Sequence, residues 1–227
     1  MNSSIVQHLR GGLIVSCQAP AEDPFATPEA QALFARAAVA GGAAGIRTHA
    51  PDYVRAIKAV APVPIVGIWK RMLADGRIMI TPTNEDAAEL VAAGADIVAV
   101  DCTARGQQHG ALQRVAWINE QLGVPVWADI ATVEEGVAAA RAGAAAVLST
   151  LRGYTPDTAQ LSSFDAGFIA QLVQAVSVPV VAEGWIATPE DASAALAAGA
   201  FAVVVGTAIT RPQEITRRFA MRLGNRV

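Results

Sequence analysis

The chain carries a repeat of short apolar segments, and this repeat limits the folds that it can adopt. One set of segments follows a Gly-Ala step, and the other set begins with Val-Pro. The two sets alternate, and one full alternation takes 49 to 61 residues. They begin at Gly42, Gly94, Gly143 and Gly199 in the first set, and at Val63, Val124 and Val178 in the second. With a further run at residues 12–16, eight strands alternate with helical segments, which predicts an α/β fold of the (β/α)8 TIM-barrel class.

The bulk composition suits one barrel with a buried sheet. At 227 residues the chain is slightly shorter than the ~250 typical of this class, so we expect one domain over residues 1–227. Apolar residues make up 53% and charged residues only 16%, as expected of strands covered on both faces. The net charge of −3 argues against a nucleic-acid partner. Neither a signal-peptide core nor an uninterrupted membrane span is found, so we expect a cytoplasmic protein without a membrane segment.

A polar residue closes each expected strand at the edge where barrel enzymes build their active sites. In chain order these residues are Gln18, Arg47, Lys70, Asp101, Asp129, Thr150, Glu183 and Thr207. Lys70, Asp129 and Glu183 each lie an even number of residues beyond the proline that starts their strand. Residues an even number apart share a face of a strand, so these three side chains, together with Gln18, should meet around the barrel axis. Rim salt bridges that only close the barrel are the structural alternative.

Glycine-bearing turns follow the last two strands. One contains Gly184, and the other contains Gly206 and Thr207 and leads to Arg211. In barrels of this class the loops after strands 7 and 8 commonly hold a phosphate through backbone N–H groups. Arg211 can add a charge-assisted hydrogen bond. These residues therefore predict a phosphorylated ligand.

The remaining reactive side chains predict little further chemistry. His8 precedes the first strand, His49 follows the second and can line the rim, and His109 lies in a polar loop. They do not form the histidine–carboxylate cluster of a metal-dependent epimerase, so we expect no catalytic metal. Cys17 and Cys102 are too few for a disulfide framework and fit a reducing compartment. A two-thiol racemising pair is the alternative to their role as small buried core residues.

Several motifs, in order along nearly the whole chain, resemble the N-acetylmannosamine-6-phosphate 2-epimerase family. The specific ones are Ser-Cys-Gln ending at Gln18, Gly-Ile-Trp-Lys-Arg ending at Arg71, and Ala-Ile-Thr-Arg-Pro ending at Pro212. The resemblance implies a barrel of the ribulose-phosphate-binding type and proton transfer at C2 of a phosphorylated amino sugar, without a cofactor. It implies acid–base roles for Lys70 and Glu183, sugar contacts from Gln18, Arg47 and Asp129, and phosphate binding by Gly184, Gly206 and Arg211. From their places at the strand ends we also expect Thr150 to contact the sugar and Thr207 to contact the phosphate. The chain differs from the usual family pattern at Trp69, at Trp185 and in the Thr-His-Ala-Pro-Asp run at 48–52.

The sequence leaves the detailed chemistry open. Lys70 can be a neutral base with a lowered pKa, or a cation that stabilises an enolate while Glu183 or a substrate hydroxyl relays the proton. A Schiff-base aldolase acting on a phosphosugar and a non-catalytic phosphosugar-binding protein remain alternatives. The apolar, arginine-studded segment 215–223 can pack on a second copy, so we expect a homodimer. The same resemblance implies a role in the catabolism of sialic acid or other amino sugars.

Overall fold

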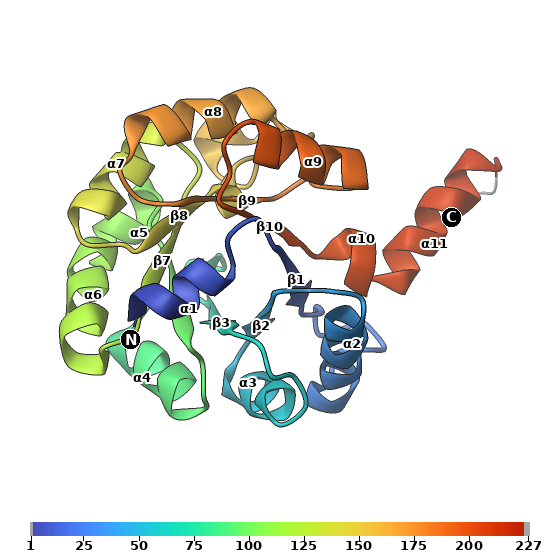
Figure 1. Ribbon diagram of the computed structural model, residues 1–227, viewed down its shortest axis with the longest axis horizontal. Helices are drawn as coiled ribbons and strands as arrows, with labels where there is room; N and C mark the ends of the chain where they lie inside the picture. Colours follow the sequence, from blue (N-terminus) through green and yellow to red (C-terminus); the bar gives the residue numbers. More distant parts are fainter. Residues whose placement is uncertain (1, 225–227) are drawn as a thin grey trace.

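Eight parallel strands close into a barrel in the computed structural model, which describes residues 2–224 (Figure 1). Around the barrel the strands follow the order β1-β10-β9-β8-β7-β6-β3-β2. Their bounds are β1 Leu13–Cys17, β2 Gly45–His49, β3 Ile65–Ile68, β6 Ile97–Asp101, β7 Val126–Asp129, β8 Ala146–Leu148, β9 Val180–Glu183 and β10 Ala202–Val205. The (β/α)8 barrel predicted from the repeat is therefore confirmed.

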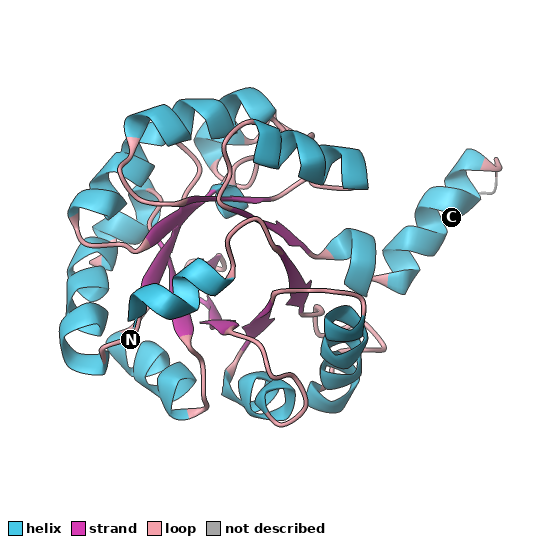
Figure 2. Ribbon diagram, in the orientation of Figure 1, coloured by secondary structure: helices cyan, strands magenta, loops and turns pink. Residues whose placement is uncertain are grey.

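Most of the helices surround the strands on the outside, whereas α1 lies across one end of the barrel and α11 points away from it (Figure 2). They are α1 Asn2–His8, α2 Pro28–Ala40, α3 Pro51–Lys58, α4 Asn84–Ala92, α5 Ala104–Gln108, α6 Ala111–Trp117, α7 Val133–Arg141, α8 Ala166–Ala175, α9 Pro189–Ala197, α10 Thr207–Thr210 and α11 Pro212–Arg222, with short η segments at Ile118–Leu122, Ser149–Leu151 and Pro156–Thr158. Helices α2, α4, α7 and α9 begin after a threonine whose hydroxyl accepts a hydrogen bond from the N–H three residues on: Thr27, Thr83, Thr132 and Thr188. Such caps satisfy N–H groups that a helix start leaves unpaired, so these threonines set where the helices begin.

Side chains alternate along each strand between the barrel interior and the layer beneath the helices. Val66 and Trp127 belong to the interior cluster, whereas the preceding Ile65 and the following Ala128 pack in the outer cluster. Both clusters are buried. Because residues two apart share a face, this alternation decides which strand-end side chains can point into the mouth of the barrel.

Helix α1 closes the amino-terminal end of the barrel, an element that the sequence analysis did not predict. Val6 and Leu9 join the interior cluster beside Ile14 and Phe201. Leu9 is fully buried, and the N–H of Gly11 donates a hydrogen bond to the Phe201 carbonyl at 2.7 Å. The barrel is therefore filled from below by apolar side chains, and polar chemistry is left to the opposite end.

A small antiparallel hairpin follows β3 at the carboxyl-terminal end, and it corrects the predicted placement of one residue. Its strands are β4 Lys70–Met72 and β5 Ile78–Ile80. Barrel strand β3 ends at Ile68, so Lys70 begins the hairpin rather than ending a barrel strand. The Asp75-Gly76 dipeptide, with Gly76 at φ +78°, marks the turn, a hairpin signal that the sequence analysis did not use.

The last helix, α11, leaves the body of the barrel (Figure 1). No residue of this helix is buried within the part of the chain that the structure describes. Phe219 and Met221 are 70% and 57% exposed, and Leu223 just beyond it is 78% exposed. Three large apolar side chains thus stand free of the core on one short segment.

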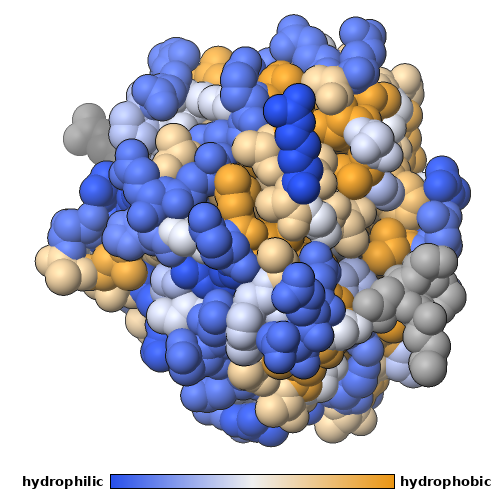
Figure 3. Space-filling model, turned by 90° about the vertical axis from the view of Figure 1, so that its left-hand side faces the viewer, coloured by the Kyte–Doolittle hydropathy of each residue, from blue (hydrophilic) through white to orange (hydrophobic). Residues whose placement is uncertain are grey.

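The side of the barrel covered by α5, α6 and α7 carries hydrophilic side chains over much of its area, with apolar residues gathered between them (Figure 3). Among residues 2–224, none of the helices combines the length and the apolar character needed to span a membrane.

Because Leu9 fills the closed end of the barrel, Leu9→Ala should lower the free energy of unfolding by about 2–5 kcal/mol through lost burial and a residual cavity. His8→Ala, which changes the exposed neighbouring residue, is the matched control and should stay within about 0.5 kcal/mol of the wild type. Urea unfolding followed by circular dichroism measures both. Equal stabilities of the two variants would contradict the role given to Leu9.

Candidate active site

Two of the residues predicted to meet around the barrel axis, Asp129 and Glu183, come together at the carboxyl-terminal ends of the strands, and Arg47 joins them. Arg47 lies on β2, Asp129 ends β7, and Glu183 ends β9. Asp129 and Glu183 are two residues beyond the interior Trp127 and Val181, and Arg47 is two beyond Gly45, which faces Leu9 and Ile14, so each points into the barrel. Thr150 follows β8 and completes the group.

Arg47 is the buried centre of this group. Its Nη2 donates a hydrogen bond of 2.7 Å to Asp129 Oδ2, and its Nε lies 3.4 Å from Glu183 Oε1. The Arg47 and Asp129 side chains are 1% and 0% exposed. Burial alone would lower the pKa of Arg47, but the charges of Asp129 and Glu183 outweigh it and raise that pKa, so the guanidinium is cationic at any working pH.

The Thr150 hydroxyl joins the two carboxyl groups. Its Oγ1 lies 2.7 Å from Asp129 Oδ1 and 2.8 Å from Glu183 Oε2. A hydroxyl has one hydrogen to donate, so both contacts are hydrogen bonds only when one carboxyl group is protonated. Burial raises the pKa of Glu183, with Asp129 adding to the effect, against the opposing pull of Arg47 and the Thr150 hydrogen bond. The two contacts therefore require one shared proton, and the raised pKa of Glu183 acts in the direction of placing it on that acid.

The backbone of Glu183 is held in place from β8. Ser149 Oγ donates to the Glu183 carbonyl at 2.8 Å and accepts from the Glu183 N–H at 3.0 Å. Ser149 is buried. It was not predicted as part of the site, because serine beside a strand end carries no distinctive sequence signal.

Lys70 stands at the rim of the group, on the hairpin. Loss of water around the ammonium lowers its pKa, Arg47 lowers it further, and Glu183 and Asp129 oppose the change without cancelling it. Lys70 as a whole keeps contact with solvent, so this lowering is smaller than that of a lysine sealed in a core. The outcome is an amine that is more readily neutral than an ordinary lysine, in the field of a fixed guanidinium.

Unpaired polar atoms lie in and beside this group. Gln18 Nε2 donates to Ser16 Oγ at 2.7 Å, whereas the buried Gln18 Oε1 has no hydrogen-bond partner within residues 2–224. Arg47 Nη1 is likewise buried without one in the described part of the chain. Unpaired buried groups of this kind cost about 1–3 kcal/mol each, and a bound ligand with an oxygen acceptor and an N–H or O–H donor would satisfy both.

The glycine turns predicted to bind phosphate lie on adjacent strands. Gly184 follows β9 with φ +95°, and Gly206 follows β10, where Thr207 opens the short α10. Arg211, at the end of α10, pairs with Asp23 at 3.0 Å and with Glu214 at 3.6 Å. Asp23 comes from the loop after β1, a partner that no sequence pattern indicated.

The structure adds two strand-end side chains that the prediction did not include in the site. Asp101 lies beside Asp129 in the β6–β7 register and accepts hydrogen bonds from the Thr103 N–H and hydroxyl at 3.1 and 2.6 Å. His49 ends β2, and its Nδ1 accepts a hydrogen bond from the Lys70 N–H at 3.1 Å. The argument that residues an even number apart share a face of a strand would also have placed Asp101 and His49 in the site. Each lies an even number of residues from an inward-facing position of its strand.

Trp185 and Tyr154 form a stacked pair next to Glu183. Their ring centroids are 5.2 Å apart with the planes at 8°, and the indole N–H donates to the Arg152 carbonyl at 2.9 Å. Gly153 makes room for the indole: a Cβ there would lie 2.6 Å from Trp185 Nε1. The aromatic residue at position 185 is thus built into the wall of the site.

The cysteines behave as core residues. Both are buried and free, and burial raises the pKa of Cys17 to about 12 and raises that of Cys102 as well. The prediction of buried structural thiols is confirmed, and a racemising thiol pair has no support. Among residues 2–224, no three His, Cys, Asp or Glu residues lie close enough together to hold a metal ion.

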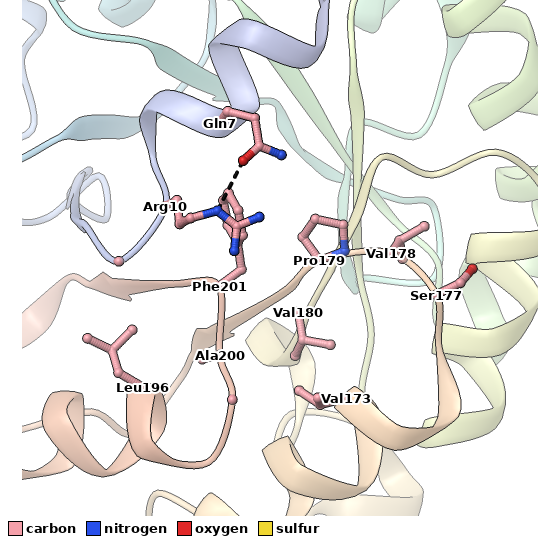
Figure 4. A pocket seen from close by; sticks show the side chains of 12 residues that line it. Gln7, Arg10, Val173, Ser177, Val178, Pro179, Val180, Leu196, Ala200 and Phe201 are labelled. Atoms are coloured by element: carbon pink, nitrogen blue, oxygen red, sulfur yellow. Dashed lines mark hydrogen bonds between the residues drawn. The ribbon is translucent and has the colours of Figure 1, made fainter.

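A cavity of about 610 Å³ lies at the opposite, amino-terminal end, between α1, α8 and α9 (Figure 4). Arg10 crosses it, hydrogen-bonded to Gln7 at 3.0 Å and stacked over the Phe201 ring. The rest of its lining is mainly apolar, with Val173, Val180 and Leu196 in view. None of the strand-end ionisable residues reaches this cavity, so we assign the chemistry to the carboxyl-terminal mouth.

Comparisons with known proteins agree on one family. A family model described as "Putative N-acetylmannosamine-6-phosphate epimerase" matches residues 31–225. A Thermosynechococcus vestitus protein is 46% identical over 91% of each chain, and one from Caldanaerobacter subterraneus subsp. tengcongensis is 44% identical over 96% of this chain and 94% of its own. Both are named "Putative N-acetylmannosamine-6-phosphate 2-epimerase".

Solved structures give the same result. The N-acetylmannosamine-6-phosphate 2-epimerase of Clostridium perfringens is 40% identical, with a TM-score of 0.90 over 96% of this chain and 95% of that one. Thiamine phosphate pyrophosphorylase from Pyrococcus furiosus has a TM-score of 0.62 at 15% identity, a likeness of fold alone.

Removing the central cation should leave two buried carboxyl groups without their partner. Arg47→Ala is expected to lower the free energy of unfolding at pH 7 by about 3–5 kcal/mol. Arg55→Ala, which breaks the exposed Arg55–Asp52 pair, is the matched control and should cost about 0–1 kcal/mol. The Arg47→Ala deficit should shrink as the pH falls, because Glu183, whose pKa Arg47 acts to lower, then becomes neutral and no longer needs the cation. Urea unfolding across a pH series measures this, and a deficit independent of pH would contradict the assignment.

Proposed function

Because the chain belongs to the N-acetylmannosamine-6-phosphate 2-epimerase family, we propose that it interconverts N-acetylmannosamine 6-phosphate and N-acetylglucosamine 6-phosphate. The observation that carries this proposal is the placement of Lys70 at the barrel mouth beside a paired Arg47, Asp129 and Glu183. Inversion at C2 requires a base that removes a carbon-bound proton and a positive group that stabilises the resulting oxyanion. Lys70 and Arg47 have these properties.

The proposed reaction begins on the open-chain sugar. Lys70 Nζ takes the proton from C2, and the electrons of that C–H bond form the C1–C2 double bond while negative charge moves to the aldehyde oxygen. The fixed guanidinium of Arg47 stabilises this charge. Glu183, directly or through a substrate hydroxyl, delivers a proton to the opposite face of C2 and restores the aldehyde with inverted configuration. Lys70 then releases the proton that it took to solvent, and Glu183 regains one from solvent.

The lowered pKa of Lys70 bears on which chemistry this residue performs. A lysine with its ordinary pKa near 10.5 is almost entirely cationic at neutral pH and is a poor base. Loss of water around the ammonium and the Arg47 charge act in the direction that a base needs, although the residue as a whole is exposed. We therefore favour Lys70 as the base rather than as a permanently cationic stabiliser.

We assign the remaining site residues to binding. Gln18 Oε1 and Arg47 Nη1 are the unpaired acceptor and donor available to the sugar, with Asp129 and Thr150 beside them. The N–H groups of the turns at Gly184, Gly206 and Thr207, with Arg211, would hold the 6-phosphate. Phosphate binding far from C2 supplies energy that orients the reacting carbon.

We also propose that the protein is a homodimer in which α11 of each copy lies on the other. An eighth outer helix normally covers the last strands of such a barrel, but α11 departs from it (Figure 1). Exposed apolar side chains occur both on this segment, at Phe219 and Leu223, and on the elements that flank the uncovered side, at Leu33, Leu196 and Ile209. In a symmetric pair, the apolar side chains of the α11 segment of one copy would pack on those of the uncovered side of the other, and both sets would be removed from water.

The cellular setting follows from this assignment as a proposal. Two free thiols without a disulfide suit the reducing conditions of the cytoplasm. The proposed substrate, N-acetylmannosamine 6-phosphate, would place the protein in the catabolism of sialic acid and other amino sugars.

The catalytic assignment predicts that Lys70→Ala lowers kcat at least 100-fold, because general base catalysis contributes about 10²–10⁴-fold. The measurement is proton NMR of N-acetylmannosamine 6-phosphate in D2O, in which the wild type should form the gluco epimer with deuterium at C2. Lys58→Ala removes the only other lysine of the chain and should keep wild-type activity. In the wild type, kcat/KM should rise with pH through a pKa below 10.5 as the base becomes neutral.

Three results would contradict this assignment. The first is a folded Lys70→Ala variant with more than a few per cent of wild-type turnover. The second is a borohydride-trapped adduct on Lys70, which would indicate a Schiff-base aldolase. The third is wild-type binding of the sugar phosphate without turnover, which would indicate a binding protein.

The dimer predicts that Phe219→Asp dissociates the protein to monomers at micromolar concentration, because it places a charge in an apolar contact. Thr216→Asp adds the same charge at an exposed polar position of the same helix and should leave the dimer intact. Sedimentation velocity measures both. A monomeric wild type, or a dimer that survives Phe219→Asp, would contradict the proposed contact.

A further inference from the structure

His49 links the second barrel strand to the segment that carries the proposed base. The N–H of Lys70 donates to His49 Nδ1 at 3.1 Å, and the N–H of Ala50 donates to the Ile68 carbonyl at 2.8 Å. Trp69 lies between these two bonds in the chain. The end of β2 therefore holds the backbone on both sides of Trp69, just where the chain leaves β3.

This link matters because the barrel itself does not hold Lys70. Strand β3 pairs with β6 at Val66 and Gly67, and β3 ends at Ile68. Beyond it the chain forms the β4–β5 hairpin, in which Met72 and Ile78 are 66% and 51% exposed. In a continuing strand, the N–H of Lys70 would donate to a backbone carbonyl of the neighbouring strand. Here it donates to the imidazole of His49, at the end of β2.

The hydrogen bond determines the state of the imidazole. An Nδ1 atom that accepts a hydrogen bond carries no proton, so the proton of the neutral ring is on Nε2. Burial lowers the pKa of His49 to about 4, and the charges of Lys70 and Arg71 contribute to this. The Tyr53 ring of α3 packs against the imidazole with centroids 6.0 Å apart. The acceptor is therefore present throughout the neutral range of pH.

The base of the hairpin is closed by a second pair of hydrogen bonds. The N–H of Trp69 donates to Thr81 Oγ1 at 3.1 Å, and the N–H of Thr81 donates to the Trp69 carbonyl at 2.7 Å. Arg71 pairs with Asp86 of α4 at 3.0 Å. These bonds close the hairpin and attach it to α4. Among the contacts of residues 2–224, only the hydrogen bond to His49 joins the backbone N–H of Lys70 to a strand of the barrel.

We propose that His49 is a positioning residue for Lys70: its neutral imidazole fixes the lysine backbone through Nδ1 and so sets the point from which the amine reaches the sugar. This inference rests on the proposed function, in which Lys70 moves the C2 proton. It concerns the rate of proton transfer and not the binding of substrate, because His49 acts on the main chain of Lys70.

Two substitutions separate the hydrogen bond from the bulk of the ring. Asparagine places its Oδ1 at the same number of bonds from Cα as Nδ1 of histidine, so His49→Asn keeps an acceptor in position. His49→Phe keeps a planar ring and removes the acceptor. We expect His49→Phe to lower kcat roughly 3- to 10-fold, the equivalent of one lost hydrogen bond, with KM within about twofold. His49→Asn should recover most of that loss.

The control variant is a second histidine, distant from Lys70. His8→Phe makes the same chemical change at the opposite end of the barrel and should leave kcat unchanged. Equal losses in His49→Asn and His49→Phe, or a loss confined to KM, would overturn the proposal. Because His49→Phe can fail to fold, long-range proton–nitrogen NMR of the wild type is the second test.

This NMR measurement needs no turnover, so its result is independent of whether the proposed reaction is correct. A His49 ring protonated on Nε2 alone at pH 7 supports the proposal, and a ring protonated on Nδ1 overturns it. Absence of epimerase activity in the wild type, by contrast, would overturn the proposed function while leaving the tautomer measurement valid.

Discussion

The buried guanidinium of Arg47 is the interaction on which the mouth of the barrel depends. A cation with a side chain 1% exposed must be paired, and here its partners come from two other strands, Asp129 on β7 and Glu183 on β9. Three strands that are distant in sequence are thereby tied together across the axis. The apolar interior below cannot supply this constraint, because hydrophobic contacts do not select one orientation for a charged group.

Loss of water and the charge of this cation together influence the protonation of the groups around it. The cation acts to lower the pKa of Lys70 and to lower that of Glu183, but burial is the larger influence on both residues and raises the pKa of the acid. The result is a lysine closer to neutrality and a glutamic acid closer to protonation, with Thr150 connecting the acid to Asp129. A base and an acid with pKa values moved toward each other suit a reaction that removes a carbon-bound proton and forms an oxyanion.

The sequence predicted the barrel and the inward set of charged residues because both follow from local periodicity. The alternation of two segment types gives the strand count, and the even spacing from Pro125 to Asp129 and from Pro179 to Glu183 gives the direction of the side chains. The plug formed by α1 depends on tertiary contacts and the departure of α11 on their absence, so periodicity revealed neither, and the hairpin at Lys70 was marked only by the Asp75-Gly76 turn. The pairing of Arg211 with Asp23 joins residues 188 positions apart and left no local signal.

Backbone strain in this fold is concentrated at the reactive rim. Among residues 2–224, the non-glycine residues with positive φ are Ala50, Thr81 and Trp185. Such conformations cost about 1–3 kcal/mol each and persist only where other contacts hold them. Each is held by a hydrogen bond, to the Ile68 carbonyl, to the Trp69 carbonyl and to the Arg152 carbonyl respectively. Ala50 follows His49, Thr81 closes the hairpin of Lys70, and Trp185 lies two residues beyond Glu183, so the strained positions adjoin the residues to which we assign the acid–base chemistry.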